Sequence, residues 1–254
     1  MKILKIVRTV FFCSLIVITP FLTLNAQAPR EIIRQMEDKM RGEASYAEMT
    51  MTSVRPRFTR EISMKSWSLG EDYAMILITA PARDQGTAFL KRANEIWNYV
   101  PGIDRTVKMP PSMMSQSWMG SDFTNDDLVR GVSTIDDFTH TLLRTETMDG
   151  HTCYVIEMIP KPDAPIVYDK VVYWVSVKYM LPVKVDNYDE FGDLANTINF
   201  KDIKNMGGRD VPAVLEIIPA TKPGHKTILT TTKADYQIKL QQSFFTIQNL
   251  TNVR

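Results

Sequence analysis

Short strand-like segments, separated by turn signals, constrain the fold of this chain more than any other feature. Near residues 49–51 and 62–64, apolar and polar residues alternate with the two-residue period of a β-strand. The other strand-like segments are residues 73–79, 95–100, 139–147, 151–159, 168–178, 183–189, 194–201, 213–218 and 226–233. Turn signals such as Pro101-Gly102 and Asp149-Gly150 lie between many of them. Ten or so strands joined by tight turns predict one large, curled antiparallel sheet.

Several of these segments are apolar on both faces. Residues 151–159 place Cys153 and Val155 on one face and Ile156 and Met158 on the other. A sheet with one face in water would alternate cleanly between apolar and polar residues. Both faces are therefore expected to be covered. Three arrangements stay open: a helix layer, a ligand held in the concavity, or a closed core without a cavity.

Residues 29–41 predict the clearest early helix. Pro29 suits a first helical turn, and Gly42 is a natural stop. The apolar residues Ile32, Ile33, Met36 and Met40 recur at helical spacing, with Arg34, Glu37, Asp38 and Lys39 largely on the other side. This pattern predicts an amphipathic helix that covers part of the sheet.

The first 28 residues have a different character from the rest. Basic residues at 2, 5 and 8 precede an apolar run from Val10 to Leu24, and Ala26-Gln27-Ala28 follows. This order is typical of a secretory signal peptide, cleaved near Ala26 or Ala28. The apolar run is shorter than the roughly 20 residues that a membrane span needs, although an uncleaved N-terminal anchor is the alternative. We expect residues 29–254 to form a single domain outside the cytoplasm.

Composition and motifs argue against several function classes. Lys and Arg number 30 against 29 Asp and Glu, so the chain has no overall basic footprint for nucleic acid. The three histidines lie in no zinc-type spacing, and there is neither a Gly-x-Ser-x-Gly elbow nor a phosphate-cradling glycine loop. His151 and Cys153 share a strand face, but an apolar strand favours an inert thiol. We expect no enzyme activity, no cofactor, no metal and no nucleic-acid partner.

Residues 109–140 break the strand pattern with an insertion rich in Met and aromatic residues. Ser112 is expected to cap a short helix that ends at Gly120. Thr124 and Asp127 have capping-box spacing and open a second helix, with apolar residues at 128 and 129. Met and Trp adapt to irregular apolar ligands, so helices of this composition over a curled sheet would form a lid for acyl chains. Alternatively, they fill the sheet with ordinary core residues.

Charged residues cluster near this insertion. The acidic ones are Asp122, Asp126, Asp127, Asp136 and Asp137. Their spacing does not match a calcium loop, so helix capping and solvated surface are expected. Arg55, Arg57 and Arg60 are interpreted as solvated strand ends, with an anionic headgroup or a partner surface as the alternative.

The segment WNYVPGIDRTVKMPPSMMSQSWMGSDFTNDDL, residues 97–128, closely resembles the outer-membrane lipoprotein-sorting protein family of the LolA-like superfamily. The segment YDKVVYWVSVKYMLPVKVDNYDEFG, residues 168–192, is similar to the same family. The resemblance implies a mainly β (α+β) fold, an incomplete antiparallel β-barrel, or half-barrel, with helices covering the open concave face. It also implies a periplasmic carrier or chaperone. Such a protein would bind acyl chains of lipoproteins, or lipids, in a hydrophobic cavity for transfer towards the outer membrane.

We assign the cavity and its lid, as a hypothesis, to apolar residues of this segment: Trp97, Tyr99, Met109, Met113, Met114, Trp118, Met119 and Phe123. Trp118 and Met113 or Met114 are expected to contact the cargo or the closed lid. An inner-membrane transporter and an outer-membrane acceptor are the expected partners of such a carrier. The alternative is a non-carrier periplasmic binding module that docks to an envelope transporter or sensor, with a filled core and an exposed apolar patch.

Overall fold

The computed structural model describes residues 28–93, 95–125, 127, 135–162, 164 and 166–253. The predicted signal peptide therefore lies outside the described residues, apart from Ala28. The helices are α1 (Pro29–Arg41) and α3 (Ile247–Asn252). The strands are β1 (Ala44–Arg55), β2 (Phe58–Leu69), β3 (Tyr73–Ala80), β4 (Ala88–Arg92), β5 (Glu95–Val100), β6 (Arg105–Lys108), β7 (Phe138–Met148), β8 (His151–Pro160), β9 (Lys170–Ser176), β10 (Pro182–Tyr188), β11 (Leu194–Met206), β12 (Arg209–Pro219) and β13 (Lys226–Asp235).

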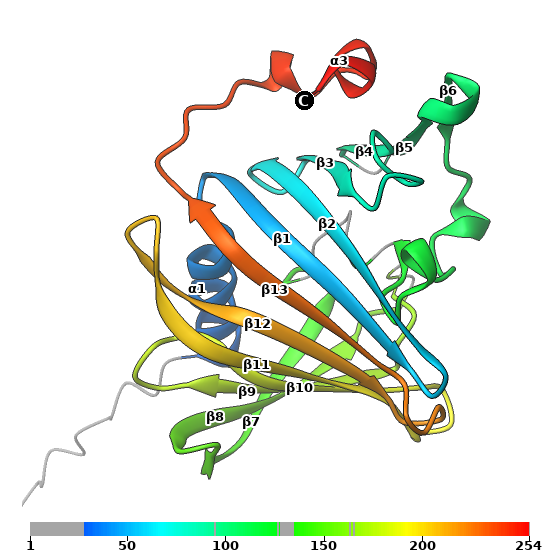
Figure 1. The fold of residues 1–254 in the computed structure, drawn as a ribbon. Coiled ribbons are helices and arrows are strands. Elements are labelled where there is room, and N and C mark those ends of the chain that lie inside the picture. Colours follow the sequence, from blue (N-terminus) through cyan, green and yellow to red (C-terminus); the bar gives the residue numbers. More distant parts are fainter. Residues whose placement is uncertain are drawn as a thin grey trace, which may run out of the picture.

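All thirteen strands belong to one antiparallel sheet, in the order β6-β5-β4-β3-β2-β1-β13-β12-β11-β10-β9-β8-β7. The first and last strands pair at its middle, with Met51 opposite Leu229. The sheet curls around α1 and does not close, since β6 and β7 are its two edges (Figure 1). The predicted curled antiparallel sheet and incomplete barrel are thus confirmed.

The two edge strands, β6 and β7, follow one another in the sequence. The chain between them must therefore pass from one edge of the sheet to the other. Residues 109–125, which we call the strap, begin this crossing with two 3₁₀ turns, Pro111–Met113 and Trp118–Gly120. The helix predicted to start at Ser112 is wrong, because each turn is only three residues long and the first has no side-chain cap. Packing on the sheet, rather than a helical hydrogen-bond ladder, holds this segment.

The predicted capping box at the end of the strap is confirmed. The backbone N–H of Thr124 donates to Asp127 Oδ2 at 2.8 Å, and the backbone N–H of Asp127 donates to Thr124 Oγ1 at 3.1 Å. Burial raises the pKa of the Asp127 carboxyl, while hydrogen bonding from the backbone and side chain of Thr124 acts in the opposite direction. The apolar positions 128 and 129 of the same prediction lie outside the described residues.

Helix α1 has the predicted bounds, from Pro29 to a stop at Gly42, whose φ is +71°. Such a φ favours glycine, because a Cβ would strain the backbone there. The expectation that Glu37 lies on the polar side is wrong, since Glu37 is buried. The helix lies inside the curl of the sheet, so more than one stripe of its surface is covered (Figure 1).

The concave face of the sheet carries two adjoining apolar clusters. In the first, Ile32, Ile33 and Met36 of α1 pack on the strands β8, β9 and β10. In the second, the strap packs on β1 to β4. Ile198 of β11 touches both clusters, so the concave face is apolar from one half of the sheet to the other.

The opposite face of the sheet is covered too, which explains the strands that are apolar on both sides. Phe245, Leu250 and Val253 of the C-terminal segment pack on β2 to β5. Near the other edge, the indole Nε1 of Trp174 donates to Glu146 Oε1 at 2.6 Å, and the Lys184 ammonium lies 4.6 Å from the Trp174 ring centroid. Charged side chains with long apolar stems therefore shield that part of the sheet.

The sequence pattern did not predict two of the strands, β4 and β6. Both are short, with five and four residues. Lys91 at the end of β4 is buried, and its ammonium donates to the backbone oxygen of Glu71. A lysine inside a short strand weakens the alternation that identifies longer strands.

Glu216 of β12 gives a test of the sheet's electrostatics. Its carboxylate accepts from Lys201 Nζ at 2.5 Å and Lys226 Nζ at 2.9 Å, and the hydrogen bond from Lys201 is the main cause of its lowered pKa. A lowered pKa stabilises the fold above the ordinary value of 4.5 and loses that effect as the pH falls through the folded-state pKa. We expect Glu216→Gln to lower the free energy of unfolding by about 1 kcal/mol at pH 7.

Urea denaturation of wild type and Glu216→Gln from pH 7 to pH 3 measures this effect. The difference between the two should shrink as the solution is acidified. The exposed Glu190, changed to Gln, serves as the control and should alter stability little at any pH. A Glu216→Gln difference that stays constant with pH would contradict the assignment.

Candidate functional site

The apolar side of the strap fills half of the concave face. Trp118 is fully buried, and its ring centroid lies 5.4 Å from that of Phe89 on β4. Phe123 is buried in the same cluster. Their neighbours on the sheet are Met51, Ile62, Met64, Ile76, Ile78 and Ile217. Strands from both ends of the sequence build this broad apolar surface, which we call the apolar floor.

A buried ion pair fastens the tip of the strap to the sheet. Arg55 Nη1 lies 2.9 Å from Asp122 Oδ2, with only 9% and 4% of the two side chains exposed. Arg55 Nη2 also donates to the backbone oxygen of Gly120 at 2.9 Å. Thr227 of β13 donates through Oγ1 to Asp122 Oδ2 at 2.7 Å and accepts from the Asp122 backbone N–H at 3.0 Å. Polar contacts from two strands thus converge on one aspartate.

Arg60, on the second strand of the β1–β2 hairpin, holds the strap at Met119, one residue before Gly120. Arg60 Nη1 donates to the backbone oxygen of Met119 at 2.9 Å, and its Nη2 donates to Asp84 Oδ2 at 2.8 Å. The interpretation of Arg55 and Arg60 as solvated strand ends is therefore wrong. Sequence alone does not bring the insertion onto the β1–β2 hairpin, because residues about 60 positions apart meet only in the folded sheet.

The eight residues predicted to contact cargo fall into three groups. Met109, Trp118, Met119 and Phe123 belong to the apolar cluster under the strap. Trp97 and Tyr99 of β5 point to the opposite face, where they pack with the C-terminal segment. Met113 is exposed and Met114 is half-buried, outside that cluster. The structure brings together four of the eight, and their role with a ligand stays a prediction.

One polar atom in the apolar cluster has no hydrogen-bond partner. The indole Nε1 of Trp118 is buried, and no described residue accepts its proton. An unsatisfied buried donor costs about 1–3 kcal/mol. Packing of the large indole ring outweighs this cost in the closed strap, and the cost disappears when the indole reaches a partner.

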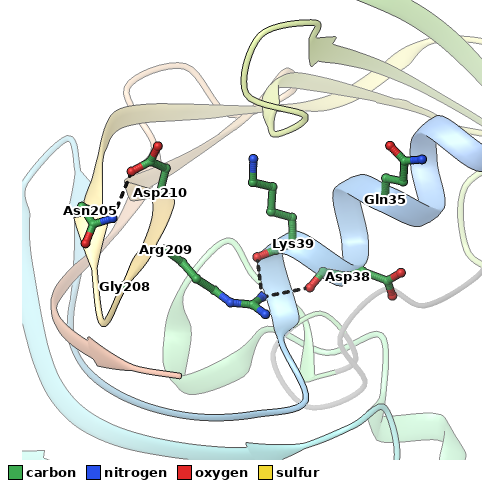
Figure 2. Close-up of a pocket in the computed structure, with 7 residues that line it drawn as sticks. All are labelled: Gln35, Asp38, Lys39, Asn205, Gly208, Arg209 and Asp210. Atoms are coloured by element: carbon green, nitrogen blue, oxygen red, sulfur yellow. Dashed lines mark hydrogen bonds between the residues drawn. The ribbon is translucent and has the colours of Figure 1, made fainter. Parts of the chain in front are cut away.

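Two surface pockets lie away from the strap. The first, of about 550 Å³, lies between the C-terminal end of α1 and the β11–β12 turn (Figure 2). Its lining is polar and consists of Gln35, Asp38, Lys39, Asn205, Gly208, Arg209 and Asp210. Arg209 Nη1 donates to the backbone oxygens of Asp38 and Lys39 at 3.1 and 3.2 Å, so it closes the end of the helix. The second pocket, of about 510 Å³, lies along the C-terminal segment. Neither has the apolar lining that an acyl chain needs.

The described residues show no arrangement for metal chemistry. No group of three or more His, Cys, Asp or Glu among them is placed to hold a metal ion. Cys153 is fully buried, its Sγ donates to the backbone oxygen of His151, and burial raises the pKa of its thiol. A buried, protonated thiol is a poor nucleophile.

The ion pair at the strap's tip leads to a prediction about local stability. Asp122→Ala removes the acceptor of Arg55 and Thr227, and breaking a buried pair from one side costs about 3–5 kcal/mol. Because the contacts hold only the strap, we expect local release there rather than global unfolding. Hydrogen exchange should show loss of protection at the Trp118 and Ser121 amides, which donate within the strap.

The matched control is Asp136→Ala. Asp136 pairs with Arg30 on the surface, where 88% of its side chain is exposed. Such a pair contributes roughly 0–1 kcal/mol, so its loss should leave strap exchange unchanged. Equal exchange in Asp122→Ala and wild type would show that the ion pair does not hold the strap.

One family model and several solved structures resemble this chain. A family model described as that of an uncharacterized protein matches residues 70–252. No curated protein matches the chain. Among solved structures, a domain from Vibrio parahaemolyticus, described as an outer membrane lipoprotein-sorting protein, is 26% identical, with a TM-score of 0.79 over 89% of this chain and 100% of that one.

Two further solved structures share the architecture. A DUF1329 family protein from Desulfovibrio piger is 24% identical, with a TM-score of 0.81 over 88% of this chain and 98% of that one. A LolA superfamily protein from Nitrosomonas europaea is 22% identical, with a TM-score of 0.74 over 87% and 98% of the two chains. The half-barrel, its strap and these matches agree with the family resemblance of residues 97–128. The chain belongs to the family matched over residues 70–252, and it shares the fold of the solved outer-membrane lipoprotein-sorting, DUF1329 and LolA superfamily domains.

Proposed function

We propose that this protein is a non-enzymatic periplasmic carrier that binds acyl chains of lipoproteins, or lipids, on the concave face of its half-barrel. The observation that carries the proposal is the apolar floor beneath the strap. Strands from both halves of the chain build it, and among the described residues Trp118 and Phe123 of the strap are buried against it, with Met109 and Met119 packed beside them. An acyl chain that takes their place would gain about 0.8 kcal/mol for each buried methylene group.

The strap has the properties of a replaceable cover. It consists of single 3₁₀ turns, so no continuous helix or sheet ladder has to break when it leaves. Its polar fastening to Arg55 and Arg60 is confined to the tip, at residues 119–122. The unpartnered indole N–H of Trp118 makes the closed state less favourable than its packing alone suggests. These features support exchange between the strap and a ligand.

We divide the predicted ligand residues according to this arrangement. Met109, Trp118, Met119 and Phe123 would exchange their contacts with the sheet for contacts with cargo. Met113 and Met114, on the outer part of the strap, would act as the movable lid. The remaining two, Trp97 and Tyr99, would reach cargo only if the C-terminal segment also left the opposite face.

The proposed carrier implies a place and partners. Residues 1–28 would direct export and be removed, and a membrane transporter would load the carrier before an outer-membrane acceptor empties it. Among the described residues, neither helix is long and apolar enough to cross a membrane. The family resemblance supports the periplasmic assignment.

A second function deserves a test, because the described concave face is filled by the chain itself. Trp118 at 0% and Phe123 at 4% exposure pack closely into the described part of this face. A permanently filled half-barrel fits a binding module that docks to an envelope transporter or sensor. The two functions differ in whether the strap must move.

A disulfide across the tip of the strap tests this movement. Asp122 and Thr227 are in direct side-chain contact, so Asp122→Cys with Thr227→Cys places two thiols together. We expect the reduced double variant to bind a fluorescent acyl-chain probe. We expect the oxidised form to lose at least tenfold in affinity, because the strap can no longer leave the floor.

The same double variant is its own control, since the oxidised and reduced proteins differ only in the crosslink. Cys153 is buried and should not interfere. Native mass spectrometry of wild type purified from its own envelope should also show bound lipid. Equal probe binding in both redox states, or no probe binding by wild type, would favour the docking module over the carrier.

A further inference from the structure

Three of the four most exposed large apolar side chains of the described protein lie at one end of the sheet. Phe191 is 81% exposed, Ile103 and Val167 are each 64% exposed, and Phe58 is 60% exposed. They belong to the turns or connections β10–β11, β5–β6, β8–β9 and β1–β2, respectively. Ile103 lies apart from the others, because the edge hairpin β5–β6 is at the upper right of Figure 1. A single exposed apolar residue is ordinary, but the remaining three at the same strand ends form a pattern.

The antiparallel pairing fixes which turns share this end. Lys170, at the start of β9, pairs with Tyr188, which in turn pairs with Leu194 at the start of β11. The neighbouring β12–β13 turn touches the β1–β2 turn, since a Cβ on Gly224 would lie 3.3 Å from Pro56 Cγ. The β1–β2, β10–β11 and β12–β13 turns gather at the lower right of Figure 1. We call this end the rim.

The turns at the opposite end of the strands have a different composition. Residues 70–72, 149–150 and 207–208 are Gly-Glu-Asp, Asp-Gly and Gly-Gly. Val177, after β9, is an exposed apolar residue at that end, with 37% exposure. Because the two ends differ in this way, we expect the rim, and not the opposite end of the strands, to contact another apolar phase.

We propose that the rim docks on the surface of a lipid bilayer, with Phe58, Val167 and Phe191 entering the interface. Phe58 and Phe191 each stand alone on their turns, among polar or small residues, and Val167 projects between Ile166 and Tyr168, which are half-buried and pack on the core. A protein partner would require a continuous apolar patch of matching shape, whereas a fluid bilayer accepts separate side chains at several points. Separate apolar tips therefore fit a bilayer better than a protein groove.

The charges on the rim show what kind of bilayer binding to expect. Exposed Arg57 and Lys222 carry positive charge, while exposed Glu190 and Asp193 flank Phe191 with negative charge. Opposite signs in one surface give little net attraction to anionic headgroups. Insertion of the apolar tips then provides the affinity, and added salt weakens it only slightly.

This docking has a geometric consequence for the strap. Arg55, which holds the strap's tip, lies directly opposite Phe58 in the β1–β2 register. A rim seated on a bilayer would bring the tip of the strap to the membrane surface. The inference goes beyond acyl-chain binding, because bilayer docking is measured without any uptake of a probe.

Flotation with lipid vesicles tests the inference on the exported protein. Mass spectrometry of the purified protein identifies its N-terminus and so checks that the predicted signal peptide is absent. One vesicle set is phosphatidylcholine alone, and the other contains added phosphatidylglycerol. We expect binding to both sets. Phe58→Ser and Phe191→Ser should each weaken partitioning about tenfold, because each removes a Phe side chain that the interface would bury.

Val167→Ser and Val177→Ser form the matched pair, with the same substitution at opposite ends of the strands. The first should weaken vesicle binding several-fold and the second should leave it unchanged. All four sites are exposed, so unchanged melting temperatures would show that the variants remain folded. Absence of binding to both vesicle sets, or equal effects of the two valine variants, would overturn the docking surface. Binding only to anionic vesicles that salt abolishes would overturn it as well. Acyl-probe uptake is assayed without vesicles, so its outcome tests the proposed carrier function and not the docking surface.

Discussion

The structure depends on one topological constraint: the two edge strands of the sheet, β6 and β7, are consecutive in the sequence. A closed barrel would pair them, and a short loop would then join them. Here the sheet stays open, so the connection has to cross from edge to edge. Its first part, the strap, brings Trp118 and Phe123 onto the concave face, where α1 already covers the other half. Both apolar clusters of that face follow from this arrangement.

Different parts of the strap make its apolar contacts and its polar contacts. Its middle packs on methionines and isoleucines of β1 to β3, which give area without directional bonds. Its tip is held by charge-assisted hydrogen bonds from Arg55 to Asp122 and Gly120. A cover of this kind has a defined closed position and few bonds to break on opening. That combination suits exchange between the chain's own side chains and an acyl chain.

The proposed carrier and the proposed docking surface meet at the same end of the molecule. Arg55 and Arg60 hold the tip of the strap where the β1–β2 hairpin ends, and Phe58 stands exposed on that hairpin. A carrier exchanges hydrophobic cargo most directly where its opening faces a bilayer, because the acyl chain then crosses little water. Each proposal nevertheless rests on its own observation. The first depends on the apolar floor, and the second on the exposed side chains of the rim.

The sequence by itself determined the β-rich class, the helix at 29–41 and most strands, because residue periodicity reports which face each element buries. The capping box of Thr124 and Asp127 was also predictable, since its partners are three residues apart. Only the tertiary structure decided that Arg55 and Asp122 form a buried pair, that Glu37 is covered, and that Trp97 and Tyr99 face away from the strap. Those outcomes depend on strands distant in sequence coming together in a curled sheet. Local spacing carries no information about which distant partner will shield a charge or share a face.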